Sequence, residues 1–203
     1  MSYDFTILKE NLIKKGYIVN VFENKELAAE YLSNQIVNKT VGFGGSVTLQ
    51  ELNLFDVLSK NNQVTWHNKM PDGLTVQQAR LKACQSEIYI SSVNGISENG
   101  EIVNIDHTGN RVAALSYGPK KIYLVIGSNK VAPTFDLALD RARNVAAPLN
   151  AKRLNRKTPC AIKGDRCYDC DSPDRICRNL SVFWEKPMGA EYEVILIDEK
   201  LGF

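Results

Sequence analysis

The stretch KKIYLVIG (120–127) is the most continuous apolar strand in the sequence. A strand buried on both faces needs such an unbroken run, and helix-covered parallel sheets are where such strands occur. Residues 134–147, TFDLALDRARNVAA, are predicted to form the helix that follows it. Pro133 precedes that helix and Pro148 is expected to end it, because proline disrupts a helix interior. A strand followed by a helix in this way is typical of an α/β sheet.

The alternation of strand and helix extends outward from this pair. Further helices are predicted at 6–15, 23–37, 46–60 and 74–84, and further strands at 17–22, 40–43, 63–67, 87–92 and 193–199. Gly16 stops the first helix, and Asn24 is a candidate cap for the second. Two Asn-Gly pairs within 93–105 favour a β-hairpin, because these residues tolerate positive φ angles. The fold class is therefore predicted to be α/β.

Length and composition are those of one ordinary domain. A chain of 203 residues with 24% charged residues can bury one core, so residues 1–203 are predicted to form a single domain. No apolar run is long enough to cross a bilayer, and the charged N-terminus does not resemble a signal peptide. We therefore expect a soluble cytoplasmic protein. In that compartment thiols stay reduced, so a cysteine cluster indicates metal binding or catalysis.

Four of the five cysteines lie within eighteen residues. They are Cys160, Cys167, Cys170 and Cys177, in an irregular, cysteine-rich segment at 158–180. The two residues between Cys167 and Cys170 let both sulfurs face one metal, and the six-residue arms can deliver the others. Four such ligands complete either a tetrahedral zinc site or a 4Fe-4S cluster. Redox-active or disulfide-forming thiols are an alternative, as is coincidence, and Cys84 is interpreted as a buried apolar residue.

The charge distribution agrees with anionic sulfur in this segment. The net charge of the chain is only +2, yet residues 151–180 hold eight Lys or Arg against four Asp. Four thiolates would cancel that excess. A basic, solvated surface segment is the alternative explanation.

The glycine-rich sequence VGFGGSVTLQEL (41–52) is a candidate anion site. Gly44 and Gly45 follow a predicted strand and precede a helix that Ser46 or Thr48 could cap. Backbone N–H groups at such a turn can converge on a phosphate or carboxylate. A tight strand-to-helix turn without a ligand is equally consistent with these residues.

A second polar cluster lies in NIDHTGNRVA (104–113), predicted as a loop after the hairpin. Asp106 could orient or accept a proton from His107, and Arg111 could hold a carboxylate through two hydrogen bonds, with Asn110 beside them. An Asx-type turn with solvated charges is the alternative. If Arg111 holds the anion, its replacement by alanine should weaken anion binding.

Residues 96–154, together with PCAIKGDRCYDCDSPDRIC (159–177), resemble the LUD-domain family of lactate utilization proteins, formerly a domain of unknown function. The resemblance implies a Rossmann-like parallel sheet flanked by helices with a small β element, similar to the phosphosugar isomerase and CoA-transferase group. It also implies organic-acid metabolism and an iron–sulfur redox partner. This chain has the short form, followed by its own four-cysteine cluster.

The tetrapeptide SENG (97–100) is similar to the one that carries the catalytic glutamate of class I CoA-transferases, which makes Glu98 a candidate nucleophile. A hairpin turn explains the same residues without chemistry. Three functions follow: binding and conversion of a small anionic metabolite, such as a 2-hydroxy or 2-oxo acid; a non-catalytic electron-transfer or assembly subunit; and a CoA-transferase.

Other partners can also be weighed from the sequence. The basic segment interleaves acids with bases and has few aromatics for stacking, which argues against nucleic acid. A homodimer is the expected assembly for such a fold. Among cofactors, a 4Fe-4S cluster is favoured, with zinc as the alternative.

Overall fold

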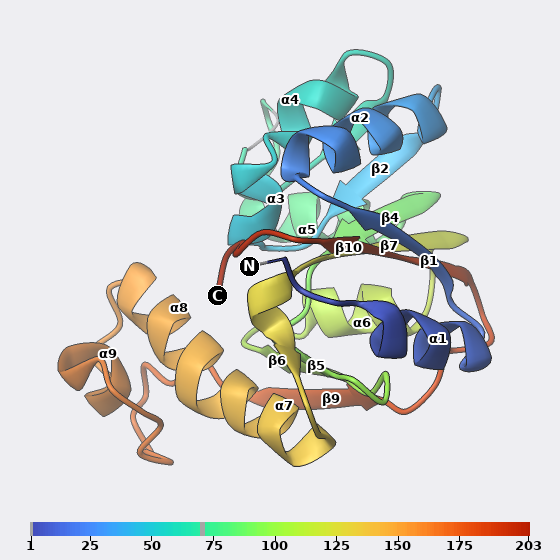
Figure 1. Ribbon diagram of the computed structural model, residues 1–203. Helices are drawn as coiled ribbons and strands as arrows, with labels where there is room; N and C mark the ends of the chain where they lie inside the picture. Colours follow the sequence, from blue (N-terminus) through green and yellow to red (C-terminus); the bar gives the residue numbers. More distant parts are fainter. Residues whose placement is uncertain (1, 70–71) are drawn as a thin grey trace.

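In residues 2–69 and 72–203, which the computed structural model describes, six parallel strands form the main sheet in the order β1-β10-β7-β4-β2-β3 (Figure 1). The strands are β1 (Ile18–Phe22), β2 (Thr40–Phe43), β3 (Gln63–Thr65), β4 (Ile88–Ser91), β7 (Lys121–Gly127) and β10 (Glu191–Ile197). The predicted strand at 120–127 is β7, which lies inside the sheet between β10 and β4 with all but its first residue buried. The predicted α/β class is confirmed.

Helices cover both faces of the main sheet (Figure 1). They are α1 (Thr6–Lys14), α2 (Lys25–Gln35), α3 (Val47–Glu51), α4 (Leu54–Ser59), α5 (Val76–Cys84) and α6 (Asn110–Ser116). On one face, α2, α3 and α4 bury leucines against β2, β7 and β10, and α1, α5 and α6 pack on the other. Asn24 caps α2 through its side chain, as predicted, and Thr75 begins α5 with a capping box. No helix in the described part of the chain is long and apolar enough to span a membrane.

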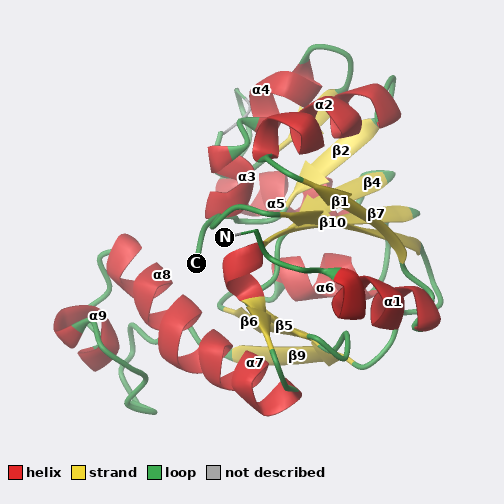
Figure 2. Cartoon of the chain, viewed as in Figure 1, coloured by secondary structure: helices red, strands yellow, loops and turns green. Residues whose placement is uncertain are grey.

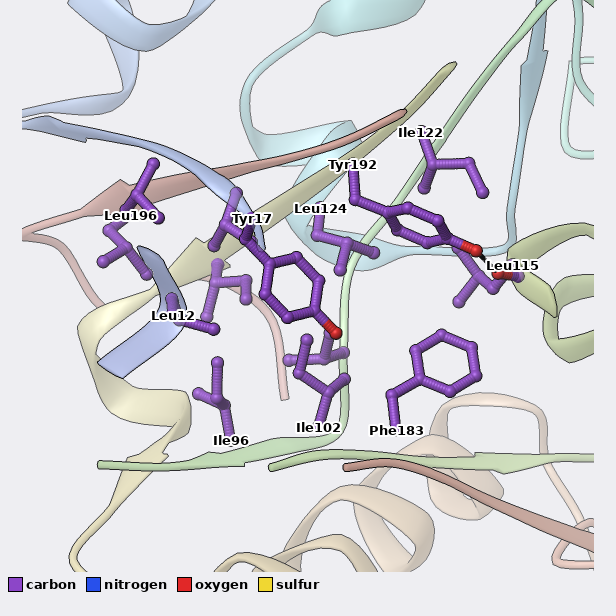
Figure 3. Close-up of a cluster of buried hydrophobic side chains, with 14 of the residues drawn as sticks. Leu12, Tyr17, Ile96, Ile102, Leu115, Ile122, Leu124, Phe183, Tyr192 and Leu196 are labelled. Atoms are coloured by element: carbon purple, nitrogen blue, oxygen red, sulfur yellow. Dashed lines mark hydrogen bonds between the residues drawn. The ribbon is translucent and has the colours of Figure 1, made fainter. Parts of the chain in front are cut away.

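A smaller sheet, in the order β8-β5-β6-β9, shares a core with the main one. Its strands are β5 (Gly95–Ser97), β6 (Ile102–Asp106), β8 (Val131–Ala132) and β9 (Asn179–Phe183). Ile102 and Phe183 of this sheet pack with Tyr17, Tyr192 and Leu12 below the main sheet (Figure 3). The hydroxyl of Tyr192 donates to the Leu115 carbonyl oxygen. The small β element that the family resemblance implied is therefore joined to the main sheet by one continuous core.

The helix after β7 is longer than predicted. It runs through α7 (Phe135–Arg141), a π-helical turn (Ala142–Ala146) and α8 (Ala147–Arg153), so Pro148 does not end it. Proline inside a regular α-helix clashes with the carbonyl group four residues earlier. The N–H of Ala147 bonds instead to the carbonyl of Ala142, five residues back, and this wider turn accommodates Pro148 at the start of α8.

Three local predictions need correction. The helix expected at 46–60 is two helices, because Asn53 takes a left-handed conformation (φ 49°) between α3 and α4. The segment 158–180 is not wholly irregular, since α9 (Pro159–Lys163) opens it and β9 begins near its end (Figure 2). The predicted loop at 104–113 contains the end of β6 and the start of α6. Of the two Asn-Gly pairs, the second supplies the hairpin turn, with Gly100 at φ +90°.

Candidate functional site

A cleft of about 250 Å³ opens where four parallel strands end. Gly45 and Ser46 follow β2, His67 follows β3, Ser92 follows β4, and Lys130 lies three residues after β7. Because the strands are parallel, their carboxyl ends meet at one edge, which is where open α/β sheets bind ligands.

The opposite wall comes from outside the main sheet. This side is lined by residues of β6, α6 and α8 and of the segments that follow them. They are Asp106 and His107 at the end of β6, Asn110 and Arg111 in the first turn of α6, Asn150 and Arg153 of α8, and Arg156 just beyond it. The cleft therefore brings together two clusters that the sequence suggested separately, the glycine turn and the polar residues at 106–111.

The cleft is strongly cationic. Its charged lining includes four arginines, Arg80, Arg111, Arg153 and Arg156. Asp106 is the one carboxylate side chain among the described lining residues. The Nε atoms of Arg80 and Arg156 and the Nδ1 atom of His67 are buried with no hydrogen-bond partner in the described structure. Leaving such groups unpaired is costly, so their arrangement favours an anionic ligand that accepts from them.

Asp106 and Arg111 bind each other and the backbone around them. The Arg111 guanidinium donates to Asn94 Oδ1 (2.8 Å), the Ile105 carbonyl (2.6 Å) and the Ser92 carbonyl (3.3 Å), and its Nε lies 3.4 Å from Asp106 Oδ2. These contacts leave Arg111 committed to the wall of the cleft. They join the loop after β4 to the end of β6.

The other Asp106 oxygen, Oδ1, accepts from the N–H groups of Thr108 (3.1 Å) and Gly109 (2.9 Å), which is an Asx turn. Burial of Asp106 opposes its ionisation, but the charge of Arg111 and these N–H groups outweigh it and lower the pKa of the carboxyl. Asp106 is therefore a carboxylate whose oxygens are occupied, which makes it a weak proton acceptor.

Two histidines border the cleft in neutral form. Burial, and then the charge of Arg80, lowers the pKa of His67. His107 is exposed for the most part, but the partial burial of its imidazole, and then the charges of Arg156 and Arg178, lower its pKa. Since the unperturbed pKa of histidine is about 6.5, both imidazoles are neutral at pH 7. Each can accept a proton or donate a hydrogen bond there.

The glycine turn offers fewer free backbone N–H groups for an anion than the sequence predicted. The Gly44 N–H donates to the Ile90 carbonyl (2.9 Å), and the Gly44 carbonyl accepts from Trp66 Nε1 (3.0 Å). A Cβ atom at Gly44 would lie 2.7 Å from Ser91 Oγ, so a larger residue there would have to displace the Ser91 side chain. Gly45 and Ser46 do face the cleft. Ser46, and not Thr48, caps α3, accepting from the Leu49 N–H (3.3 Å).

Glu98 lies away from this cleft. It occupies the turn between β5 and β6, at the opposite end of the hairpin from Asp106. Its Oε1 accepts from the Tyr3 hydroxyl (2.9 Å), and its carbonyl accepts from Asn11 Nδ2 (2.8 Å). The transferase hypothesis required Glu98 to lie near the glycine turn. The structure instead places Glu98 at the hairpin tip, where it contacts Tyr3 and Asn11.

The four cysteines line one small apolar cavity of about 20 Å³ below α8. The Asp169 N–H donates to Cys167 Sγ (3.3 Å), and the Thr158 hydroxyl contacts Cys160 Sγ (3.3 Å). Arg175 holds the segment closed by donating to the carbonyls of Cys170 (2.9 Å) and Cys177 (3.0 Å).

A donor set of four thiols around an apolar space suits zinc or an iron–sulfur cluster. Within residues 2–69 and 72–203, however, no group of three or more His, Cys, Asp or Glu side chains is placed closely enough to hold a metal ion. Cys84, the fifth cysteine, lies outside this cavity, and burial raises the pKa of its thiol, as expected for an unreactive packed residue.

The cleft and the cysteine cavity share one helix. Asn150 and Arg153 of α8 face the cleft, whereas Ala147, Pro148 and Ala151 of the same helix face the cysteine cavity. The two sites therefore lie on different faces of α8.

A family model described as the LUD domain matches residues 6–197. The chain belongs to the LUD-domain family. A solved structure, described as the crystal structure of a DUF162 family protein from Deinococcus radiodurans, is similar to this LUD domain with a TM-score of 0.53. The match covers 94% of each chain at 12% identity, so it shows the fold alone. No curated protein matches the sequence significantly.

The family that the motifs predicted is thus confirmed, but much of the cleft was not foreseen. Arg80, Lys130 and the neighbouring pair Arg153 and Arg156 come from three separate parts of the chain and were not candidates in the sequence. One signal did exist for Lys130, because it follows the central strand, where ligands of parallel sheets bind. For Arg153 and Arg156 the signal was the basic excess of residues 151–180.

Proposed function

We propose that this LUD-domain protein binds a small organic anion, a 2-hydroxy or 2-oxo acid, in the cationic cleft, and that it acts in organic-acid metabolism. The observation that carries this proposal is the pair of buried, unpartnered guanidinium Nε atoms of Arg80 and Arg156 in the cleft lining. Arginine binds carboxylates through two parallel hydrogen bonds, so these side chains suit a carboxylate ligand.

Each lining residue has a distinct part in this proposal. Arg80, Arg153 and Arg156 attract and bind the carboxylate, while Asn110 and the Gly45–Ser46 turn contact the rest of the small molecule. Arg111 is a positioning residue, because its hydrogen bonds connect the loops on either side. His107 transfers a proton more readily than Asp106, whose oxygens are occupied.

Calorimetry with L-lactate and pyruvate, and with inorganic phosphate as a comparison, tests this function. We expect binding by the wild type and a strong loss in Arg80→Gln and Arg156→Gln. A hydrogen bond to a charged group contributes about 1.5–3 kcal/mol, which corresponds to roughly 10- to 150-fold in affinity. Arg166→Gln is the matched control, since it removes the same charge from an exposed position outside the cleft. Absence of binding by both L-lactate and pyruvate would overturn the proposal, whether or not phosphate binds.

We also propose that the cysteines at 160, 167, 170 and 177 hold a metal centre, with a 4Fe-4S cluster favoured over zinc. Their shared cavity supports this, as does the spacing in the sequence. A cluster would supply electron transfer, whereas zinc would fasten the loop between α9 and β9. Anaerobic purification with metal and sulfide analysis, on wild type and Cys167→Ala/Cys170→Ala, decides between them. A metal-free wild type would contradict both.

The position of α8 also supports a second function, that of an electron-transfer or assembly subunit. Because this helix borders both the cleft and the cysteine cavity, a redox centre there could make the protein a non-catalytic electron-transfer or assembly subunit. That function predicts co-purification with an iron–sulfur partner and no turnover of any hydroxy acid. Turnover by the isolated protein would contradict it.

A further inference from the structure

Lys130 is a buried amine in the cleft wall that anion binding does not use. The residue is 3% exposed, and its Nζ donates to Thr48 Oγ1 and Ser92 Oγ, each at 2.9 Å. No ion pair with a described carboxylate includes it. A buried lysine that lacks a counter-ion is unusual, because burial of a charge is costly unless the charge is paired.

The surroundings of Lys130 favour the neutral amine. Burial, and then the positive charges of Arg141 and Arg111, lowers its pKa well below the ordinary value, and Glu51 opposes this only weakly. Desolvation and neighbouring cations are the two conditions that turn a lysine into a nucleophile. Carbonyl carbons are the usual targets of such an amine, since the addition product can lose water to form an imine.

The two hydroxyl partners of Lys130 differ in what they can do. The Thr48 hydroxyl donates its proton to the Leu201 carbonyl (3.2 Å), so towards Lys130 it acts as an acceptor. The Ser92 hydroxyl has no acceptor of its own among the described residues, and it can rotate to accept from or donate to the amine. Ser92 also lines the cleft, so it can carry a proton between Lys130 and a bound molecule.

We propose that Lys130 is a catalytic nucleophile that forms an imine with a 2-oxo acid held in the cleft. This inference rests on the proposed anion binding and narrows its substrate class from hydroxy acids to oxo acids. The Nζ lone pair forms a bond to the carbonyl carbon, and the carbonyl oxygen leaves as water with the two protons that the amine gives up. The step neither oxidises nor reduces, and Ser92 carries one of the protons.

Reductive trapping tests this assignment. The protein is incubated with pyruvate and sodium cyanoborohydride, digested and mapped by mass spectrometry. We expect the adduct, one pyruvate less one water plus two hydrogens, mainly on Lys130. L-lactate, which has no carbonyl carbon to attack, should give none. The adduct should be lost in Lys130→Met and retained in Lys60→Met, where an exposed lysine is changed in the same way.

The outcomes separate this inference from the function on which it rests. Calorimetric binding of pyruvate without an adduct on Lys130, or with adducts spread evenly over exposed lysines, overturns the imine and leaves anion binding standing. If neither pyruvate nor L-lactate binds, the proposed function itself fails. Should Lys130→Met not fold, the peptide map of the wild type still decides, because it reads the modified residue directly.

Discussion

Replacement of Arg111 by methionine should lower the free energy of unfolding more than it weakens ligand binding by the folded protein. The side chain would lose its two short hydrogen bonds, to Asn94 Oδ1 (2.8 Å) and the Ile105 carbonyl (2.6 Å), and would leave the Asp106 carboxylate buried beside an apolar group. Removing one partner of a buried ion pair costs about 3–5 kcal/mol. The long 3.4 Å separation between Arg111 Nε and Asp106 Oδ2 places the expected loss near the lower end, about 3 kcal/mol.

Urea unfolding followed by circular dichroism measures this loss, and calorimetry with pyruvate measures binding by the folded variant. Arg153→Met is the matched comparison, because Arg153 is an exposed residue of the same cleft whose side chain, among the described residues, hydrogen-bonds only Asn150. We expect Arg153→Met to weaken binding with little effect on stability. If Arg111→Met instead left the unfolding free energy within about 0.5 kcal/mol of wild type and abolished binding, Arg111 would be a direct ligand of the anion, and the positioning role would be refuted.

Three further predictions concern the core, the buried carboxylate and the cysteines. Tyr192→Phe should lower the unfolding free energy by about 1–3 kcal/mol because it leaves the Leu115 carbonyl unpaired, whereas Tyr17→Phe should cost almost nothing, since its buried hydroxyl has no partner in the described structure (Figure 3). Equal losses in urea unfolding would contradict this. The depressed pKa of Asp106 stabilises the fold at pH values above its unfolded pKa of about 4, and this stability is lost as the pH falls through the folded pKa. The Asp106→Asn variant should therefore lose less stability than wild type on acidification. An unchanged slope of unfolding free energy against pH would contradict this prediction. Treating the purified protein with a chelator should lower its melting temperature if the cysteine metal is structural, and no shift in the Cys167→Ala/Cys170→Ala variant is the control.

The main sheet could be predicted from the sequence because its signal is local. Strand β7 is a continuous apolar run, and the helices that cover the sheet begin at side-chain caps such as Asn24. Where local rules failed, a backbone detail was responsible. Asn53 adopts a left-handed conformation that splits one predicted helix, and a π-helical turn carries another helix through Pro148.

The cleft was harder to predict because its chemistry is assembled by tertiary structure. Arg80 on α5, Lys130 after β7 and Arg156 after α8 are far apart in sequence, and nothing local marks them as neighbours. Arg111 and Asp106 were visible as a polar cluster, but the sequence could not show that they satisfy each other. A charged pair close together in sequence is therefore as consistent with a structural ion pair as with a ligand-binding site.

The π-helical turn at Ala142–Ala146 determines which way each side chain of the following helix, α8, points around the helix axis. It accommodates one more residue than a regular α-helical turn, and each residue of an α-helix turns the chain by about 100°. Deleting a single residue from this turn would rotate α8 by about that angle and carry Arg153 away from the cleft. The same rotation would turn Ala151 away from the cysteines. One residue of insertion thus keeps the cleft and the cysteine cavity aligned on the same helix.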